Sequence, residues 1–266
     1  KSNEMKTFRL IGMALLAVCV SFASCSSDDE EPAKNDDGVI TNQKLLVELR
    51  MTEEDGESVI TEYSYDSKGK LLSANRRDSD YGREYTITWG ANKIIESGNR
   101  DAITYTLEDG LITHTSDSDG GDLENATFTY NANKQLIKLQ YNENEYTVFT
   151  WQDEKLTKMT WNFSDEDIYE LSYSGKTCKG YLPIMVWNVD DLRPLLEAHP
   201  ELVGMRCNQL PDKVYSKEEI YEITEQYTYT FDKDGYVESC TEESTYKRLD
   251  IDETRTETTI YTFTWE

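Results

Sequence analysis

From residue 44 onward, apolar and polar residues alternate with a period of two, and strand-forming Tyr, Thr, Trp, Phe and Ile dominate the runs. This period is typical of β-strands with one buried face, because successive side chains of a strand point to opposite sides. Each run ends in a cluster of turn residues and then resumes. The phrases are YSYDSKGKLL at 63–72, TITWGANKII at 86–95, TYTLEDGLIT at 104–113, TFTYNANKQLI at 127–137, VFTWQDEKLT at 148–157, ELSYSGKT at 170–177 and YTFDKDGYV at 229–237.

Each phrase predicts a β-hairpin. Four turn residues with Gly, Asn or Lys at the last position suit a type I turn followed by a left-handed residue. The shorter Asp109-Gly110 loop suits a tighter hairpin. In four phrases a large residue is followed six positions later by an aliphatic one, and we expect the two to pack beside each other across the turn. The pairs are Tyr65 and Leu71, Trp89 and Ile95, Tyr130 and Leu136, and Phe231 and Val237.

Successive hairpins without helices between them predict an all-β fold, an antiparallel β-meander. Because twist accumulates and open edges aggregate, a long meander curls into a barrel-like sheet or covers its edges. The face opposite the aromatic residues carries Thr104, Thr106 and Glu108, or Thr228, Thr230 and Asp232. Lipid would not tolerate these residues, so we expect a soluble curved or closed sheet rather than a membrane-embedded barrel.

One segment interrupts the meander. Residues 174–216 hold four of the five prolines. Within them VDDLRPLLEAHPEL predicts one short helix, with Asp190 or Asp191 as a cap and Pro194 in its first turn. The leucines at 192, 195, 196 and 202 give the helix an apolar side. Insertions of this length in compact β domains are usually functional or plug-like.

The N-terminal residues 1–24 have the pattern of a signal peptide. A basic start with Lys6 and Arg9 precedes an apolar stretch from Leu10 to Ala23 that is too short to span a membrane. Phe22-Ala23-Ser24-Cys25 matches a bacterial lipoprotein cleavage box, which predicts that Cys25 is acylated. The alternative is an ordinary secretory signal with Cys25 as a plain thiol.

Residues 25–40 read as an acidic flexible tether, since they lack the apolar residues needed to fold. The run after Cys25 resembles the acidic export signal of surface-exposed lipoproteins in Bacteroidetes, although a solvated linker would look the same. We therefore expect an outer-membrane lipoprotein exposed at the cell surface, with residues 41–266 as a single domain.

The net charge of −25 limits the partners. A body this acidic repels phosphate backbones, so we expect no nucleic-acid partner. It also disfavours flat adhesion to anionic lipid, which leaves the acyl chains as the contact with the membrane.

Three cysteines remain in the domain: Cys178, Cys207 and Cys240. The first two bracket the irregular segment and are the candidate disulfide pair if one forms. The alternative is three buried thiols that act as small apolar residues.

These features together support a named resemblance. The aromatic hairpins, the cleavage box, the YLPIMVWN…NQLP insertion and the YTFTW ending resemble a family of Bacteroidetes lipoproteins. That family is of unknown function and is described as having a porin-like fold. The resemblance covers residues 44–266. It implies a barrel-like meander and carries no catalytic residues over to this chain.

Catalytic templates are scarce in the sequence. The two histidines, His114 and His199, sit in unrelated contexts, and His199 beside Pro200 reads most simply as a surface or helix-end residue. No nucleophile elbow, zinc-protease helix, phosphate loop or dinucleotide fingerprint occurs. With 52 acidic residues a two-carboxylate glycoside hydrolase stays open, although most of the acids are expected on solvated faces.

The loop DSDGGDLE is the best local candidate for a metal. Asp117, Asp119, Asp122 and Glu124 could gather oxygen ligands around Ca²⁺, and the two glycines between them allow the backbone to turn inward. The spacing is not that of an EF-hand. An acidic hairpin loop is the competing interpretation.

The aromatic residues are the last candidates. Tyr105, Phe128 and Trp151 lie at strand spacing and are expected in the core. Trp187 and Tyr181 lie in the insertion and are the candidate ligand-binding residues. The function predicted is a non-catalytic binding or scaffold module for a glycan, peptide or lipid. The alternatives are a carrier that encloses a small apolar ligand in the barrel, or the hydrolase.

Overall fold

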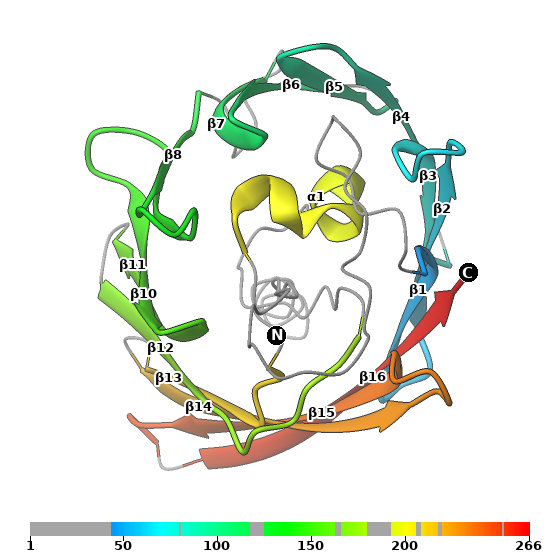
Figure 1. Cartoon of the computed structure of the whole chain (residues 1–266). Coiled ribbons are helices and arrows are strands. Elements are labelled where there is room, and N and C mark those ends of the chain that lie inside the picture. The colour runs from blue at the N-terminus through cyan, green and yellow to red at the C-terminus, as the bar shows by residue number, and fades with distance from the viewer. Residues whose placement is uncertain are drawn as a thin grey trace, which may run out of the picture.

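The computed structural model describes residues 44–79, 81–99, 101–117, 125–162, 166–179, 193–205, 209–217, 220–251 and 253–266. Sixteen strands of these residues pair antiparallel in chain order, and β1 pairs with both β2 and β16, which closes the barrel (Figure 1). The strands are β1 Leu46–Glu53, β2 Ser58–Tyr65, β3 Leu71–Arg77, β4 Gly82–Trp89, β5 Lys93–Ser97, β6 Ala102–Glu108, β7 Leu111–Asp117, β8 Thr127–Tyr130, β9 Leu136–Gln140, β10 Tyr146–Gln152, β11 Lys155–Asn162, β12 Glu166–Ser172, β13 Lys213–Lys217, β14 Tyr221–Phe231, β15 Val237–Arg248 and β16 Glu253–Trp265. The predicted all-β meander is confirmed.

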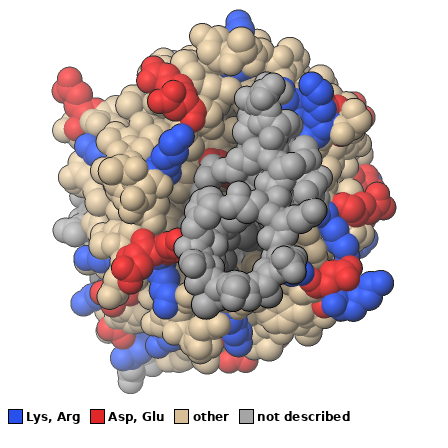
Figure 2. Space-filling view, in the orientation of Figure 1, with Lys and Arg blue, Asp and Glu red and all other residues tan. Residues whose placement is uncertain are grey.

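Burial follows the period-two pattern. On β4, Tyr85 and Ile87 are buried whereas Thr86 and Thr88 are exposed. Inward residues of all parts of the ring share one apolar core, and the outward positions are mainly Thr, Ser and charged residues. Acidic and basic side chains are interspersed around the face in Figure 2. The large apolar side chains that are exposed among the described residues are Leu72, Tyr81, Phe231, Leu249, Ile251 and Ile260.

The turns have the predicted chemistry. The side-chain oxygen of Asp66 accepts hydrogen bonds from the backbone of Lys68 and Lys70, and Asp232 and Asn131 cap their own turns in the same way. The fourth turn residue has a positive φ in each case: 79° at Gly69, 61° at Lys134 and 90° at Gly235. Asp109 and Gly110 both have positive φ, as a tight two-residue hairpin requires.

The register across the turns agrees with three of the four predicted pairs. Tyr65 lies opposite Leu71, Tyr130 opposite Leu136 and Phe231 opposite Val237, each after a one-residue register shift. The prediction for Trp89 was wrong by one residue, because Trp89 lies opposite Ile94. The turn after it is closed directly by a hydrogen bond from Gly90 N to Lys93 O at 2.8 Å and carries no register shift.

The aromatic residues at the strand ends before the turns also donate hydrogen bonds to the preceding hairpin. The indole N–H of Trp89 donates to the carbonyl of Leu71 at 2.8 Å, and that of Trp151 donates to Leu136 at 2.7 Å. Because each acceptor is the first residue of the neighbouring incoming strand, each bond joins consecutive hairpins along one rim. Further bonds of this kind run from Tyr65 to Leu46, Tyr130 to Ile112, Tyr173 to Leu156, and Trp265 to Val237.

The insertion enters the barrel. Its helix α1 (Pro194–Ala198) and the 3-10 turn η2 (Pro200–Val203) lie inside the ring of strands (Figure 1). Leu195, Leu196 and Leu202 are buried in the common core, as the predicted apolar side requires. The plug-like interpretation of the insertion is confirmed for this part, which we call the plug segment (residues 193–205).

The predicted helix start was wrong. The N-cap is Arg193, not Asp190 or Asp191, and no side chain caps the helix. Arg193 is extended (φ −72°, ψ 134°) because the proline that follows it disfavours helical backbone. The helix also ends earlier than the pattern suggested, since Pro200 cannot continue it and a separate turn follows.

The structure leaves several predictions untested. The signal peptide, Cys25 and the tether lie outside the described residues, and the domain boundaries stay predictions. Within the described ranges, the helices are all too short or too polar to cross a membrane.

Candidate functional site

The lumen has two unlike walls. We call β2–β7, on which the plug segment packs, the plug wall, and β14–β16, on the other side of the ring, the polar wall (Figure 1). Inward positions on both walls carry carboxylates in addition to apolar residues. How each wall holds those carboxylates decides what it can do.

Glu197 of α1 is fixed to β2 and β3. The hydroxyl of Tyr63 donates to its Oε2 at 2.7 Å, and the guanidinium of Arg76 forms an ion pair with its Oε1. The Nε of Arg76 also donates to Thr61 Oγ1 at 3.1 Å. The Glu197 side chain is 3% exposed, so a buried carboxylate of the plug segment meets a cation supplied by the wall.

The start of α1 is held by β5 and β6. Glu96, fully buried on β5, accepts a hydrogen bond from the Tyr105 hydroxyl at 2.7 Å and a longer one from Leu195 N at 3.4 Å. Burial raises the pKa of Glu96 to about 7, although the hydrogen bond from Tyr105 and the charge of Arg193 oppose the shift.

Arg193, one residue before α1, faces two acids of the wall, one just before β6 and one at the end of β7. It forms an ion pair with Asp101, and its Nη2 lies 3.8 Å from Asp117 Oδ2. The side chains of Arg193 and Asp117 are 7% and 1% exposed. Asp117 therefore points into the barrel and toward the plug segment.

His199 joins the two plug helices to the rim of β3. Leu71 N donates to His199 Nε2 at 3.2 Å, so Nδ1 carries the ring hydrogen and donates it to Glu201 Oε1 at 2.9 Å. The rings of Trp89 and Tyr65 meet the imidazole edge-on, at centroid distances of 5.3 and 6.1 Å. His199 is 2% exposed, so the helix-end prediction is confirmed and the surface prediction was wrong.

Gly204 sets how closely the plug segment approaches β8 and β9. Its φ is +64°, and a Cβ there would lie 2.2 Å from the carbonyl oxygen of Lys134 and 3.0 Å from the ring of Tyr130. The contact has no room for a larger residue, because the obstacle is backbone.

On the polar wall, Glu242 and Glu225 are held by hydroxyl groups. Glu242 on β15 accepts hydrogen bonds from Ser244 Oγ at 2.7 Å and from the Tyr261 hydroxyl at 3.1 Å. One strand away, the Tyr227 hydroxyl donates to Glu225 at 2.6 Å. Glu242 is 9% exposed, and burial raises its pKa while the two hydroxyl groups oppose the shift.

Ser244 on β15 lies opposite Glu225 on β14 and Glu257 on β16, and Tyr246 lies two residues further along β15. The pKa of Tyr246 is raised by burial and then by the negative charges of Glu225, Glu242 and Glu257. The guanidinium of Arg255 lies over the Tyr246 ring at 4.7 Å and pairs with Glu257 at 3.4 Å. This group of rings and carboxylates can hold an organic cation, since a cation gains from both.

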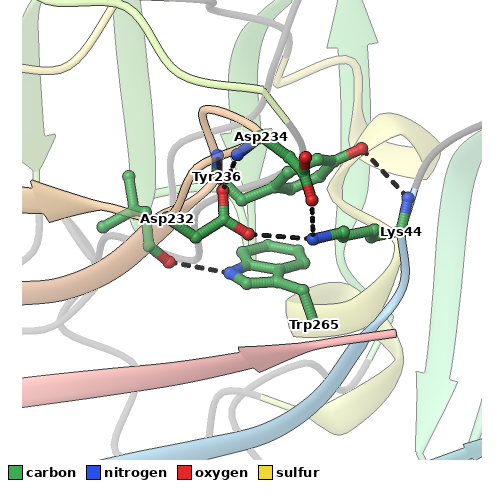
Figure 3. A network of polar contacts seen from close by, with 6 residues as sticks. Lys44, Asp232, Asp234, Tyr236 and Trp265 are labelled. Carbon is green, nitrogen blue, oxygen red and sulfur yellow. Dashed lines mark hydrogen bonds and ion pairs between the residues drawn. The ribbon is translucent and has the colours of Figure 1, made fainter.

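A third polar cluster links the residues before β1 to the turn between β14 and β15 (Figure 3). Lys44, two residues before β1, places its ammonium 2.9 Å from Asp232 and 2.6 Å from Asp234 in the β14–β15 turn, and 5.2 Å from the centre of the Tyr236 ring. The Lys44 ammonium lowers the pKa of Asp232 to about 2. Since β16 lies between β1 and β15, Lys44 reaches across the closing strand.

The residues predicted from the sequence are distributed as follows. Asp117 faces Arg193, whereas Asp119, Asp122 and Glu124 lie outside the described residues, so the calcium site stays a prediction. Elsewhere, no group of three or more acidic, His or Cys side chains in the described ranges is arranged to hold a metal.

Trp187, Tyr181 and Cys207 also lie outside the described residues, so their predicted roles stay untested. Cys178 is half-buried, and Cys240 is a buried thiol whose pKa burial raises. Among the expected core aromatics, Tyr105 and Phe128 are buried and Trp151 is half-buried.

Glu96, Glu197 and Glu242 were not predicted as buried residues, because most acids were expected on solvated faces. For two of them, the alternation along the strand does indicate an inward side chain. Glu96 lies two residues after buried Ile94 on β5, and Glu242 lies two residues after buried Cys240 on β15, so each acid is on the inward face of its strand.

Comparisons with known proteins agree with this architecture. A family model described as a domain of unknown function (DUF4595) with porin-like fold matches residues 84–239, more than half of the chain. The crystal structure of a porin-like protein from Bacteroides uniformis superposes with a TM-score of 0.61 at 19% sequence identity, over 82% of this chain and 96% of that one. A search of curated proteins gave no match.

The structural likeness shows a shared fold, and the family match confirms the resemblance drawn from the hairpins and the insertion. The chain belongs to the DUF4595 family, a family of unknown function with a porin-like fold.

Proposed function

We propose that this protein is a surface-anchored lipoprotein that binds a basic peptide at the polar wall of its barrel, and that it acts as a binding module rather than an enzyme. The observation that carries the proposal is Glu242, a buried carboxylate whose partners among the described residues are the hydroxyl groups of Ser244 and Tyr261. Hydroxyl groups satisfy its hydrogen bonds and leave its charge uncompensated. A ligand that brings a positive charge would gain most there.

The surroundings of Glu242 favour an organic cation. Glu225 and Glu257 lie on either side of Ser244, the guanidinium of Arg255 lies over the Tyr246 ring, and the rings of Tyr227 and Tyr261 belong to the same wall. Ammonium and guanidinium groups bind well between carboxylates and aromatic faces. The net charge of −25 would also raise the local concentration of a basic ligand.

The chain already uses this chemistry on its own cations. Arg255 lies between the Tyr246 ring and Glu257, and Lys44 lies between the Tyr236 ring and two aspartates. Peptide side chains of the same types would meet a similar environment at the polar wall.

The apolar-ligand alternative has less support. The most deeply buried apolar wall residues, such as Leu71, Ile94 and Ile103, belong to one core with Leu195 and other plug residues. The chain's own leucines thus take up the apolar surface that a lipid-like ligand would need. A glycan ligand and two-carboxylate hydrolysis stay predictions.

Two observations support attachment by an anchor. Outward positions of the strands are mainly polar, unlike the apolar band of an embedded barrel. Lys44, which follows the predicted tether, is fixed to the barrel, so an acylated Cys25 would hold the domain at the membrane through residues 26–43.

Two experiments on cells test the anchor and its exposure. Cys25→Ala is expected to release the protein from the membrane fraction. Protease treatment of intact cells is expected to digest the wild type, and resistance to it would contradict surface exposure.

Calorimetric titration with a lysine-rich peptide tests the binding. The expected result is binding that weakens with salt and that Glu242→Gln weakens by about tenfold or more. Glu243→Gln is the matched control, because Glu243 is adjacent but exposed on the outer face. Equal binding by the two variants, or binding of a neutral oligosaccharide with no binding of the peptide, would contradict the proposal.

A further inference from the structure

We infer that a proton held at Glu96 seats helix α1 of the plug segment against the plug wall, so that α1 is held firmly in acid and loosens as the pH rises. The inference concerns a second feature of the lumen and does not depend on the ligand of the polar wall. It rests on how charges are distributed where α1 meets the strands.

Among the described residues, the buried contact between α1 and the plug wall has more acids than bases. Two guanidiniums, those of Arg76 and Arg193, face four carboxylates. The carboxylates are Glu96, Asp101, Asp117 and Glu197.

Within the described ranges, the contacts show which of the four carboxylates has no guanidinium partner. Arg76 pairs with Glu197, and Arg193 pairs with Asp101 and lies near Asp117. Glu96 instead receives hydrogen bonds from the Tyr105 hydroxyl and from Leu195 N. A carboxyl group that is fully buried without an ion pair is favoured in its neutral form.

Among the described residues, several elements carry groups that sense the charge of Glu96. Glu197 of α1 raises its pKa, Arg193 just before α1 lowers it, and the Tyr105 hydroxyl of β6 hydrogen-bonds it. The neighbouring strand β4 contributes Tyr85, and β7 contributes Asp117, both of which lie in the same charge network.

The remaining titratable groups belong to the η2 side of the plug segment and to β2. They are His199, Glu201, Tyr63 and Tyr65, and they contact one another or Glu197 rather than Glu96. The η2 side is held by the His199 contact with Leu71 and by the close approach at Gly204, neither of which needs Glu96. Loosening should therefore begin at α1.

The direction with pH follows from linkage. Because the pKa of Glu96 is raised from 4.5 to about 7 when α1 is seated, its contribution to seating is complete below pH 4.5 and is lost as the pH rises through 7. If Glu96 regains its ordinary pKa when α1 opens, the opening equilibrium is expected to rise about tenfold between pH 6 and pH 8.

Hydrogen exchange of the full chain tests this inference. The amides of Leu196, Glu197 and His199 donate within the helix or its cap and report on α1. After correction for the intrinsic pH dependence of exchange, wild-type amides in α1 are expected to exchange about tenfold faster at pH 8 than at pH 6. Amides of β14 and β15 should change far less.

Two variants separate the proposed proton from a general effect of pH. Glu96→Gln keeps a neutral group at the site and should remove the pH dependence in α1. Glu242→Gln changes a buried acid on the opposite wall and should leave that dependence intact. The inference is overturned if wild-type α1 shows no pH-dependent change in protection, or if Glu96→Gln retains the full change. The wild-type profile decides the question even if Glu96→Gln does not fold.

Discussion

Glu197 on the plug wall and Glu242 on the polar wall are buried carboxylates that are held in opposite ways. On the plug wall, Glu197 and Asp117 face the guanidiniums of Arg76 and Arg193. On the polar wall, Glu242 is held by hydroxyl groups. The chain itself supplies cations to Glu197 and Asp117, whereas Glu242 receives only hydrogen bonds.

This difference separates a structural role from a binding role. Buried ion pairs between an insertion and a strand fix the position of the insertion, because a mispositioned partner would leave a charge alone in the core. A carboxylate held by hydroxyl groups keeps its geometry but retains an unmet demand for positive charge. The plug wall is thus built to hold its own segment, and the polar wall is suited to a ligand.

The largest expected effect is at Arg76. Arg76→Met leaves the carboxylate of Glu197 buried without its cation, and we expect a loss of about 3–5 kcal/mol in the free energy of unfolding, measured by urea denaturation. Arg77→Met is the matched control, since Arg77 is the next residue but forms an exposed ion pair with Glu62 on the outer face. Similar losses for both variants would mean that the buried Arg76–Glu197 ion pair contributes no more to stability than the exposed Arg77–Glu62 pair.

A smaller loss is expected at Gly204. Gly204→Ala places a Cβ against the carbonyl of Lys134 at a positive φ, so the plug segment must shift, and we expect a loss of about 2–4 kcal/mol. Gly110→Ala shares the positive φ but has open space around it, and about 1 kcal/mol is expected there. Equal effects of the two changes would argue that the plug segment does not press on this rim.

At Glu242, unlike at Arg76 and Gly204, we expect the substitution to cause no loss of stability at pH 8. Since burial raises the pKa of Glu242, the stability linked to this group is present in acid and falls as the pH rises through that pKa. Glu242→Gln removes the fall, so at pH 8 its urea midpoint should equal or exceed that of the wild type. A clear loss at pH 8, like that of Arg76→Met, would show that the two walls are alike.

Among the variants expected to lose stability, apart from the controls, the smallest loss is expected at the rim. Trp151→Phe removes the hydrogen bond to the buried Leu136 carbonyl and should cost about 1–2 kcal/mol in denaturant titration. Phe231→Leu removes aromatic area at the same place in another hairpin without removing a donor, and should cost less. A larger loss at Phe231 would indicate that area rather than the hydrogen bond joins the hairpins.

Much of the fold could be predicted because its information is local. Alternation along each run sets which side chains point inward, and turn residues such as Asp66 and Gly69 set where each strand reverses. The register at Trp89 could not be predicted, because its turn closes without the extra residue that the other phrases accommodate.

The candidate site could be predicted only in part, because its contacts are distant in the sequence. Arg76 and Glu197 are 121 residues apart, and no spacing rule links them. The insertion was identified because it breaks the repeat, but which wall it packs on depends on ring closure. The polar wall was not predicted, because the sequence contains many acids and only a few of them lie at inward positions of their strands.

Methyl NMR during titration with the lysine-rich peptide tests the division of the lumen most directly. Ile223, which pairs with Tyr246 in the β14–β15 register, reports on the polar wall, and Ile94 and Ile103 report on the plug wall. We expect the peptide to shift the Ile223 methyl signal and to leave those of Ile94 and Ile103 unchanged. Shifts at Ile94 and Ile103 without one at Ile223, or no shift at any of the three, would contradict the account.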